Sequence, residues 1–182
     1  MRRVFQKSGT ADKPPSLSWD GGFVMIGLLE LCAEVQDMVL AAIPAEGLPV
    51  KIALESRQDG GETARSVLDG RLYAKAGALY LRYAEEDGRI RSTLRWDGRT
   101  LRLVRTGDVE SAQTFEPGVE TGGYYRTPLV RFDLRTRTRR LRVEADGRSF
   151  PMVWSWAYRL EAGGADAGEF VINLTIREAD ES

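Results

Sequence analysis

From Leu48 onward, apolar and polar residues alternate with a period of two, and short turn sequences interrupt the alternation. Ile172 and Leu174, for example, alternate with Asn173 and Thr175. This pattern is typical of antiparallel strands that bury one face and expose the other. Asp-Gly pairs between such runs are among the strongest hairpin signals, and they occur at 59–60, 69–70, 87–88, 97–98 and 146–147.

The alternating runs number about ten, and nearly all are joined by turns too short for a parallel crossover. A meander of this length removes its exposed edges by closing on itself. An immunoglobulin-like sandwich would need Greek-key crossings, and the sequence has few long connections. We therefore expect an all-β fold, a single antiparallel up-and-down β-barrel, formed by residues 48–182.

Residues 1–47 are expected to form a separate N-terminal extension. The segment 8–22 is rich in turn-forming residues and is predicted to be disordered, whereas 25–43 has the spacing of an amphipathic helix. Three acidic residues within 25–43 argue against a membrane span, because each costs about 2.5–3.5 kcal/mol at the centre of an inserted helix. The helix is expected to dock on the barrel or to pair with a partner. Alternatively, translation starts at Met25 or Met38.

The residue types that are missing limit the chemistry. The chain has no histidine and one cysteine, which excludes Ser-His-Asp and Cys-His arrangements, the usual zinc sites and an intrachain disulfide. We expect no metal, no cofactor and no catalytic residues. The formal net charge of −1 favours neither a membrane nor nucleic acid as partner. The single cysteine fits a cytoplasmic protein.

Two charged residues extend apolar rows at the ends of predicted strands. Glu85 continues the row of Leu81 and Tyr83, and Arg105 continues the row of Leu103. One interpretation is that both charges mark the solvated rim of the barrel. The other is that they meet inside its mouth, because a buried charge needs a partner and further hydrogen bonds. Donors for those hydrogen bonds are expected from Tyr80, Tyr83 and Tyr125.

An aromatic stripe lies in the segment 150–160, where Trp154, Trp156 and Tyr158 alternate on one face. Such a stripe can form an ordinary barrel core, or it can line a cavity for one small molecule. A second group of side chains, Arg131, Arg135, Arg137 and Arg139, lies on an outer face. Stacking aromatics are not interleaved with these arginines, so a solvated face is favoured and nucleic-acid binding is not expected.

Several motifs occur together in a fixed order: YLRYAEE at 80–86, Gly88, Arg105-Thr106-Gly107, Phe115 and YYRTPLVRFDLRTRTRRL at 124–141. In this succession the chain resembles the YwiB-like family of small bacterial proteins from about Val50 to Glu178. The resemblance implies a calycin-like, that is lipocalin-like, β-barrel in the bacterial cytoplasm. It implies no catalytic residues, because no biochemical function is established for the family.

These observations favour a barrel that binds a small molecule without transforming it. The alternatives are a protein-interaction module that uses an aromatic or basic surface, and a histidine-free enzyme built on Arg105, Glu85 and tyrosines. The candidate ligand-binding residues are Tyr80, Tyr83, Glu85, Arg105, Phe115, Tyr125, Trp154, Trp156 and Tyr158.

Overall fold

The computed structural model describes residues 43–144 and 150–179, which form ten strands and one short 3₁₀ helix. The predicted helix at 25–43 lies outside the described residues except for Ile43. The strands are β1 (Leu48–Gln58), β2 (Thr63–Lys75), β3 (Ala78–Glu85), β4 (Ile90–Trp96), β5 (Leu101–Gly107), β6 (Glu110–Phe115), β7 (Glu120–Arg126), β8 (Arg131–Glu144), β9 (Met152–Ala162) and β10 (Ala165–Glu178), and the 3₁₀ helix η1 is Glu86–Gly88.

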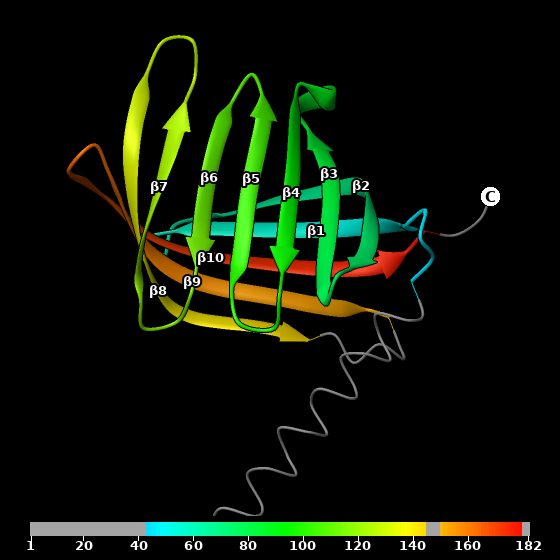
Figure 1. Ribbon diagram of the computed structural model, residues 1–182. Helices are drawn as coiled ribbons and strands as arrows, with labels where there is room; N and C mark the ends of the chain where they lie inside the picture. The colour runs from blue at the N-terminus through cyan, green and yellow to red at the C-terminus, as the bar shows by residue number, and fades with distance from the viewer. Residues whose placement is uncertain (1–42, 145–149, 180–182) are drawn as a thin grey trace, which may run out of the picture.

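The ten strands form one closed barrel, which confirms the predicted fold class. Each strand pairs with its neighbours in sequence, and β1 pairs antiparallel with both β2 and β10 to complete the ring. In Figure 1 the strands β3 to β7 stand upright in front, while β1, β9 and β10 run across behind them. The barrel is therefore two layers of strands that cross at a large angle, one of the two usual ways in which sheets pack.

The alternation in the sequence decides which side chains enter the barrel. Ile52 and Ile176 are cross-strand partners on β1 and β10, as are Leu81 and Leu94 on β3 and β4, and all four belong to the core. Because the side-chain period of a strand is two, a shift of one residue would turn each row outward, so the apolar rows determine the register.

Aromatic rings fill the middle of the barrel between the two layers. The ring of Phe115 on β6 lies 5.6 Å from that of Trp156 and 4.9 Å from that of Tyr158, both on β9. Tyr158 in turn stacks on Phe170 of β10 at 5.2 Å. Trp154 is completely buried in the same core cluster. The aromatic stripe of β9 is thus part of the core, the first of its two interpretations.

One end of the barrel, which we call the η1 end, carries the β1–β2, β3–β4, β5–β6, β7–β8 and β9–β10 turns. The β7–β8 hairpin extends beyond its neighbours at this end (Figure 1), and its tip residue Leu129 is 92% exposed. At the same end lies the short ladder between β6 and β7, which consists of three residue pairs. Farther along, Gln113 on β6 donates a hydrogen bond to Thr136 on β8, at 3.4 Å.

Candidate functional site

A group of polar side chains faces the inside of the barrel toward the η1 end. The buried polar residues in the described part of the chain all belong to inward rows of β4, β6 and β8: Ser92, Ser111, Gln113, Thr136 and Thr138. We call this set the polar wall. It is unusual because the other inward rows of the barrel are occupied mainly by aliphatic and aromatic residues.

Glu85 and Arg105 meet at the open edge of the polar wall. Nε of Arg105 on β5 lies 3.2 Å from Oε1 of Glu85 on β3. Ser92 lies on β4 between them, where it is the cross-strand partner of both Tyr83 and Arg105, and its hydroxyl donates to the same carboxylate oxygen. The two charged side chains remain 22% and 29% exposed, so solvent reaches the pair. The two charges therefore meet, as the second interpretation expects, but they keep contact with solvent, as the first expects.

Two tyrosine hydroxyls border this ion pair. Burial and the negative charge of Glu85 raise the pKa of Tyr83 to about 12, against the opposing effects of Arg105 and of a hydrogen bond with Ser92. Burial also raises the pKa of Tyr158 to about 12, against the opposing charge of Arg105. Both phenols are therefore protonated at neutral pH and can donate a hydrogen bond.

Four buried polar atoms have no hydrogen-bond partner among the described residues. They are Oγ of Ser111, Oγ1 of Thr138, Nε1 of Trp154 and Nε1 of Trp156. Ser111 is the cross-strand partner of Arg105, and Thr138 is the partner of Tyr158. An unsatisfied buried polar group costs about 1–3 kcal/mol, so each of these atoms calls for a partner, which a water molecule, an ion or a ligand can supply.

Eight of the nine candidate residues face the lumen. Glu85 and Arg105 lie at its open edge, Tyr125 is half-buried next to Phe132, and the other inward candidates are buried: Tyr83, Phe115, Trp154, Trp156 and Tyr158. Tyr80 is the exception. It lies on the outer face of β3, where its hydroxyl accepts a hydrogen bond from Arg95.

Three small hydroxyl side chains of the site, Ser92, Ser111 and Thr138, were not identified from the sequence. A signal for them was present, because each occupies an inward position of an alternating strand where an apolar residue is expected. These hydroxyl groups decide which ligands the site can bind. It offers neutral donors and one compensated cation, and the described residues contain no cluster of acidic or cysteine ligands for a metal ion.

The fold and this interior define a class: a small closed antiparallel β-barrel whose lumen is aromatic in the middle and polar at one end. Residues 50–174 match the family described as "Domain of unknown function (DUF1934)". That match spans most of the chain, and the protein belongs to this family.

Two comparisons with individual proteins agree with this membership. The chain is 28% identical to the uncharacterized beta-barrel protein YwiB of Bacillus subtilis (strain 168) over 109 residues, which are 59% of this chain and 74% of the other. The crystal structure of YwiB from Bacillus subtilis superposes with a TM-score of 0.64 at 21% sequence identity, covering 76% of this chain and 96% of that one. The structural likeness supports the barrel fold. Within residues 43–144 and 150–179, no helix is long and apolar enough to cross a membrane.

Proposed function

We propose that the barrel binds a small polar molecule at its η1 end and does not transform it. The observation that carries this proposal is the position of the unpartnered hydroxyl of Ser111 directly across the β5–β6 ladder from Arg105. A ligand with acceptor oxygens, such as a carboxylate, would satisfy this hydroxyl and the guanidinium together. Charge-assisted hydrogen bonds of this kind are shorter and stronger than neutral ones.

Binding is favoured over catalysis by the state of the surrounding groups. Tyr83 and Tyr158, with pKa values of about 12, hold their protons too tightly to act as general bases near neutral pH. The chain also has no histidine, the commonest general acid and base. What the wall offers instead is a fixed set of donors beside a pair of charges that solvent reaches. We place this binding protein in the cytoplasm, in agreement with its single cysteine.

The aromatic core below the polar wall limits the size of the ligand. Contacts of Phe115 with Trp156 and Tyr158 join the two layers of the barrel. A ligand that enters from the η1 end meets these rings after passing Arg105. We therefore expect a compact molecule with its polar groups on the wall and a small apolar part against the rings.

The test is native mass spectrometry of the full chain for bound small molecules, followed by thermal-shift screening of small carboxylates. We expect a stoichiometric adduct that persists in the wild type and is lost in Arg105→Met and in Ser111→Ala. Arg142→Met is the matched control, since Arg142 pairs with Glu144 on the outside of β8. If no adduct forms and no carboxylate raises the melting temperature, or if Arg142→Met removes binding equally, the proposal is wrong.

Thr138→Val separates binding from stability. Valine has nearly the shape of threonine but lacks the hydroxyl, whose oxygen has no partner among the described residues. Removing a buried unpaired hydroxyl is neutral or stabilising, by up to about 1–2 kcal/mol. We expect Thr138→Val to leave the free energy of unfolding unchanged or higher while it weakens the adduct. Loss of stability together with unchanged binding would show that Thr138 has a purely structural role.

A further inference from the structure

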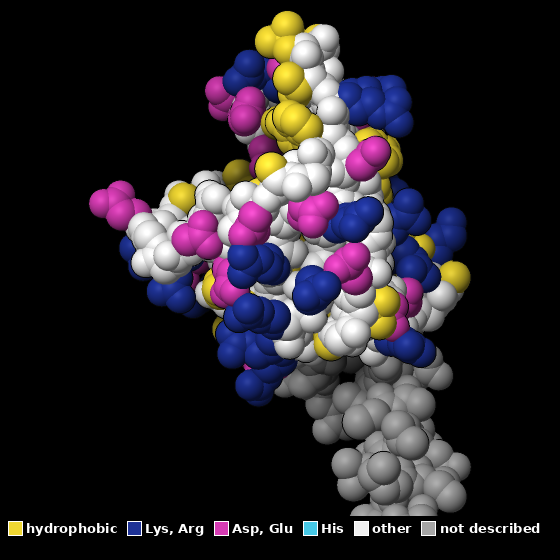
Figure 2. Space-filling model, turned by 90° about the vertical axis from the view of Figure 1, so that its left-hand side faces the viewer, with side chains coloured by type: hydrophobic (Ala, Val, Ile, Leu, Met, Phe, Trp, Pro, Cys, Tyr) yellow, Lys and Arg dark blue, Asp and Glu magenta, His cyan; other side chains and the backbone are white. Residues whose placement is uncertain are grey.

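On the outside of the barrel, several arginines are paired across neighbouring strands. Like charges directly opposite one another destabilise a sheet, and three of these pairs have a carboxylate that offsets the repulsion. They are Arg126 with Arg131, accompanied by Glu110; Arg137 with Arg159, accompanied by Glu120 and Asp166; and Arg95 with Arg102, accompanied by Asp97. In Figure 2, which views the left-hand side of Figure 1, basic and acidic side chains are accordingly interspersed over the barrel surface.

A fourth pair, Arg71 on β2 and Arg82 on β3, is different. The two residues are direct cross-strand partners, and neither forms an ion pair with any described residue. Arg71 donates instead to the carbonyl oxygens of Glu46 and Gly47, at 3.1 and 3.3 Å. The guanidinium of Arg82 lies 5.1 Å from the ring centre of Tyr73. Both cations are thus held in place, and no carboxylate of the described residues pairs with them to offset their mutual repulsion.

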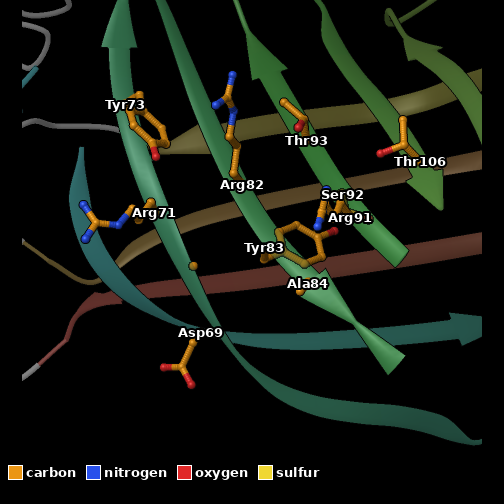
Figure 3. A pocket seen from close by; sticks show the side chains of 11 residues that line it. Asp69, Arg71, Tyr73, Arg82, Tyr83, Ala84, Arg91, Ser92, Thr93 and Thr106 are labelled. Atoms are coloured by element: carbon orange, nitrogen blue, oxygen red, sulfur yellow. The ribbon is translucent and has the colours of Figure 1, made fainter. Parts of the chain in front are cut away.

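These two arginines line a shallow open groove of about 560 Å³ on the outer face of β2 to β5. Figure 3 shows Tyr73, Arg82, Thr93 and Thr106 next to one another on four successive strands. Arg91 also lines the groove and likewise has no ion pair among the described residues. The one acidic side chain in the lining, Asp69, is already paired with Lys51. The groove is therefore cationic and is built to receive an anion.

Aromatic rings share this face with the arginines. Tyr73 and Tyr80 are cross-strand partners on β2 and β3, and Arg95 and Arg102 continue the same row onto β4 and β5. The guanidinium of Arg95 lies 6.0 Å from the ring centre of Tyr80. Surfaces that bind single-stranded nucleic acid combine cationic and aromatic side chains across several strands. The arginines contact phosphates, and the rings stack against bases.

We infer that the outer face of β2 to β5 binds single-stranded nucleic acid. The backbone phosphates would lie along Arg71, Arg82 and Arg91, and a base would stack near Tyr80. A polymer fits better than a free nucleotide because the groove is open, whereas sites for small ligands usually enclose roughly 70–90% of the ligand surface. A strand gains affinity from several phosphates at once, and the row of arginines supplies contacts for more than one. Tyr83 and Ser92 border both this groove and the lumen, but the three arginines and Tyr80 lie outside the polar wall, so variants at these positions leave the residues of the proposed function in place.

The experiment measures fluorescence anisotropy of a labelled oligothymidine of about twelve nucleotides, a length within the range of single-strand binding sites, with the full-length protein at low salt. We expect saturable binding whose affinity falls with salt. The logarithm of the binding constant should fall against the logarithm of the salt concentration with a slope of about −2 for three phosphate contacts. Arg71→Gln with Arg82→Gln should lower the affinity about tenfold or more and reduce the slope by about 1.4. The matched control, Arg137→Gln with Arg159→Gln, removes an equivalent cross-strand pair and should change the affinity less than about twofold, because those arginines already have acidic partners.

Substitutions of Tyr80 test the stacking contribution separately. Tyr80→Ala should weaken oligothymidine binding about fivefold or more, and Tyr80→Phe, which keeps the ring, should not. Binding of inorganic polyphosphate, which has no bases, should be the same in both variants. If Arg71→Gln disturbs the fold through its carbonyl contacts, Arg82→Gln with Arg91→Gln replaces it. The inference is overturned if the oligonucleotide does not bind, if the control pair causes an equal loss, or if polyphosphate or a DNA duplex binds as tightly as the single strand.

Discussion

Arg105 on β5 reaches past β4 to place its Nε atom 3.2 Å from Oε1 of Glu85 on β3. Two strand ends that carry opposite charges are in this way joined inside the mouth of the barrel. Ser92 on the intervening strand holds the carboxylate from one side. The ion pair is therefore one part of a network of hydrogen bonds, and its strength decides how rigidly the mouth is held.

A double-mutant cycle measures that strength. Exposed ion pairs are worth about 0–1 kcal/mol, whereas breaking a fully buried pair costs about 3–5 kcal/mol. Since Glu85 and Arg105 are partly exposed, we expect a coupling energy of about 1–3 kcal/mol between Glu85→Gln and Arg105→Met in urea denaturation. The control cycle uses Glu120 and Arg137, a cross-strand pair on the surface, and should give less than about 1 kcal/mol. Equal coupling in both cycles would show that the mouth pair has no special environment.

The two buried tyrosines predict a loss of stability at alkaline pH. An exposed tyrosine has a pKa of 10.0, whereas Tyr83 and Tyr158 have pKa values of about 12 in the folded protein. Because the folded state holds the protons more tightly, the stability that they contribute is fully present below pH 10.0 and is lost as the pH rises toward about 12. Tyr83→Phe with Tyr158→Phe should flatten the decline of the unfolding free energy in this interval. An absorbance titration of tyrosinate that finds both groups ionising near their ordinary pKa in the folded protein would contradict this.

Gly123 and Gly122 are neighbours on β7, but only Gly123 lacks the space for a side chain. A Cβ atom on Gly123 would lie 2.3 Å from the backbone oxygen of Ala112, whereas a Cβ atom on Gly122 would meet nothing within 4 Å. We expect Gly123→Ala to lower the free energy of unfolding by about 2–4 kcal/mol, because backbone cannot move aside as a flexible side chain does. Gly122→Ala should stay within about 0.5 kcal/mol of the wild type. A Gly123→Ala protein as stable as Gly122→Ala would mean that β6 and β7 separate easily at this point.

The start of the barrel can be located by truncation. Ile43 packs against the core cluster, and the carbonyl oxygens of Glu46 and Gly47 accept hydrogen bonds from Arg71. A chain of residues 43–182 should melt cooperatively, since every strand is retained. A chain of residues 48–182 should also fold but with a free energy of unfolding lower by about 1–3 kcal/mol, through the lost contacts. Calorimetry distinguishes the outcomes, and aggregation of the longer fragment would show that residues 1–42 belong to the fold.

Local alternation was sufficient to predict the strands, their antiparallel order and the inward rows that end in Glu85 and Arg105. The same alternation puts Tyr80 and Tyr83 on opposite faces of β3, so the expectation that Tyr80 lines the lumen was wrong and conflicted with the rule that predicted the strand. Contacts between the two layers could not be predicted in this way. The approach of Phe115 to Tyr158 depends on how the barrel closes and on a register shift between Thr138 and Arg140. Neither has a local signal in the sequence.

The cationic groove has no signal in the sequence for a related reason. The alternation in the sequence shows which arginines share one face of a single strand, as several arginines of β8 do. The pairing of Arg71 with Arg82 instead requires the register between two strands, which the turn at Ala76 and Gly77 establishes. A turn longer by one residue would have brought a different side chain next to Arg71. Features that arise between strands therefore need the folded structure, even where each strand is predicted correctly.

The closure of β1 on β10 has a consequence for biosynthesis. Asp59, which directly follows β1, and Glu169 on β10 bond to one another although they are 110 residues apart. Among the strands of the described residues, β1 leaves the ribosome first, and its second edge is covered last, when β10 has been made. While β2 to β9 are being synthesised, β1 has an uncovered edge that can pair with another nascent chain. Chains released before β10 is complete keep two open sheet edges and are expected to be substrates for chaperones and proteases.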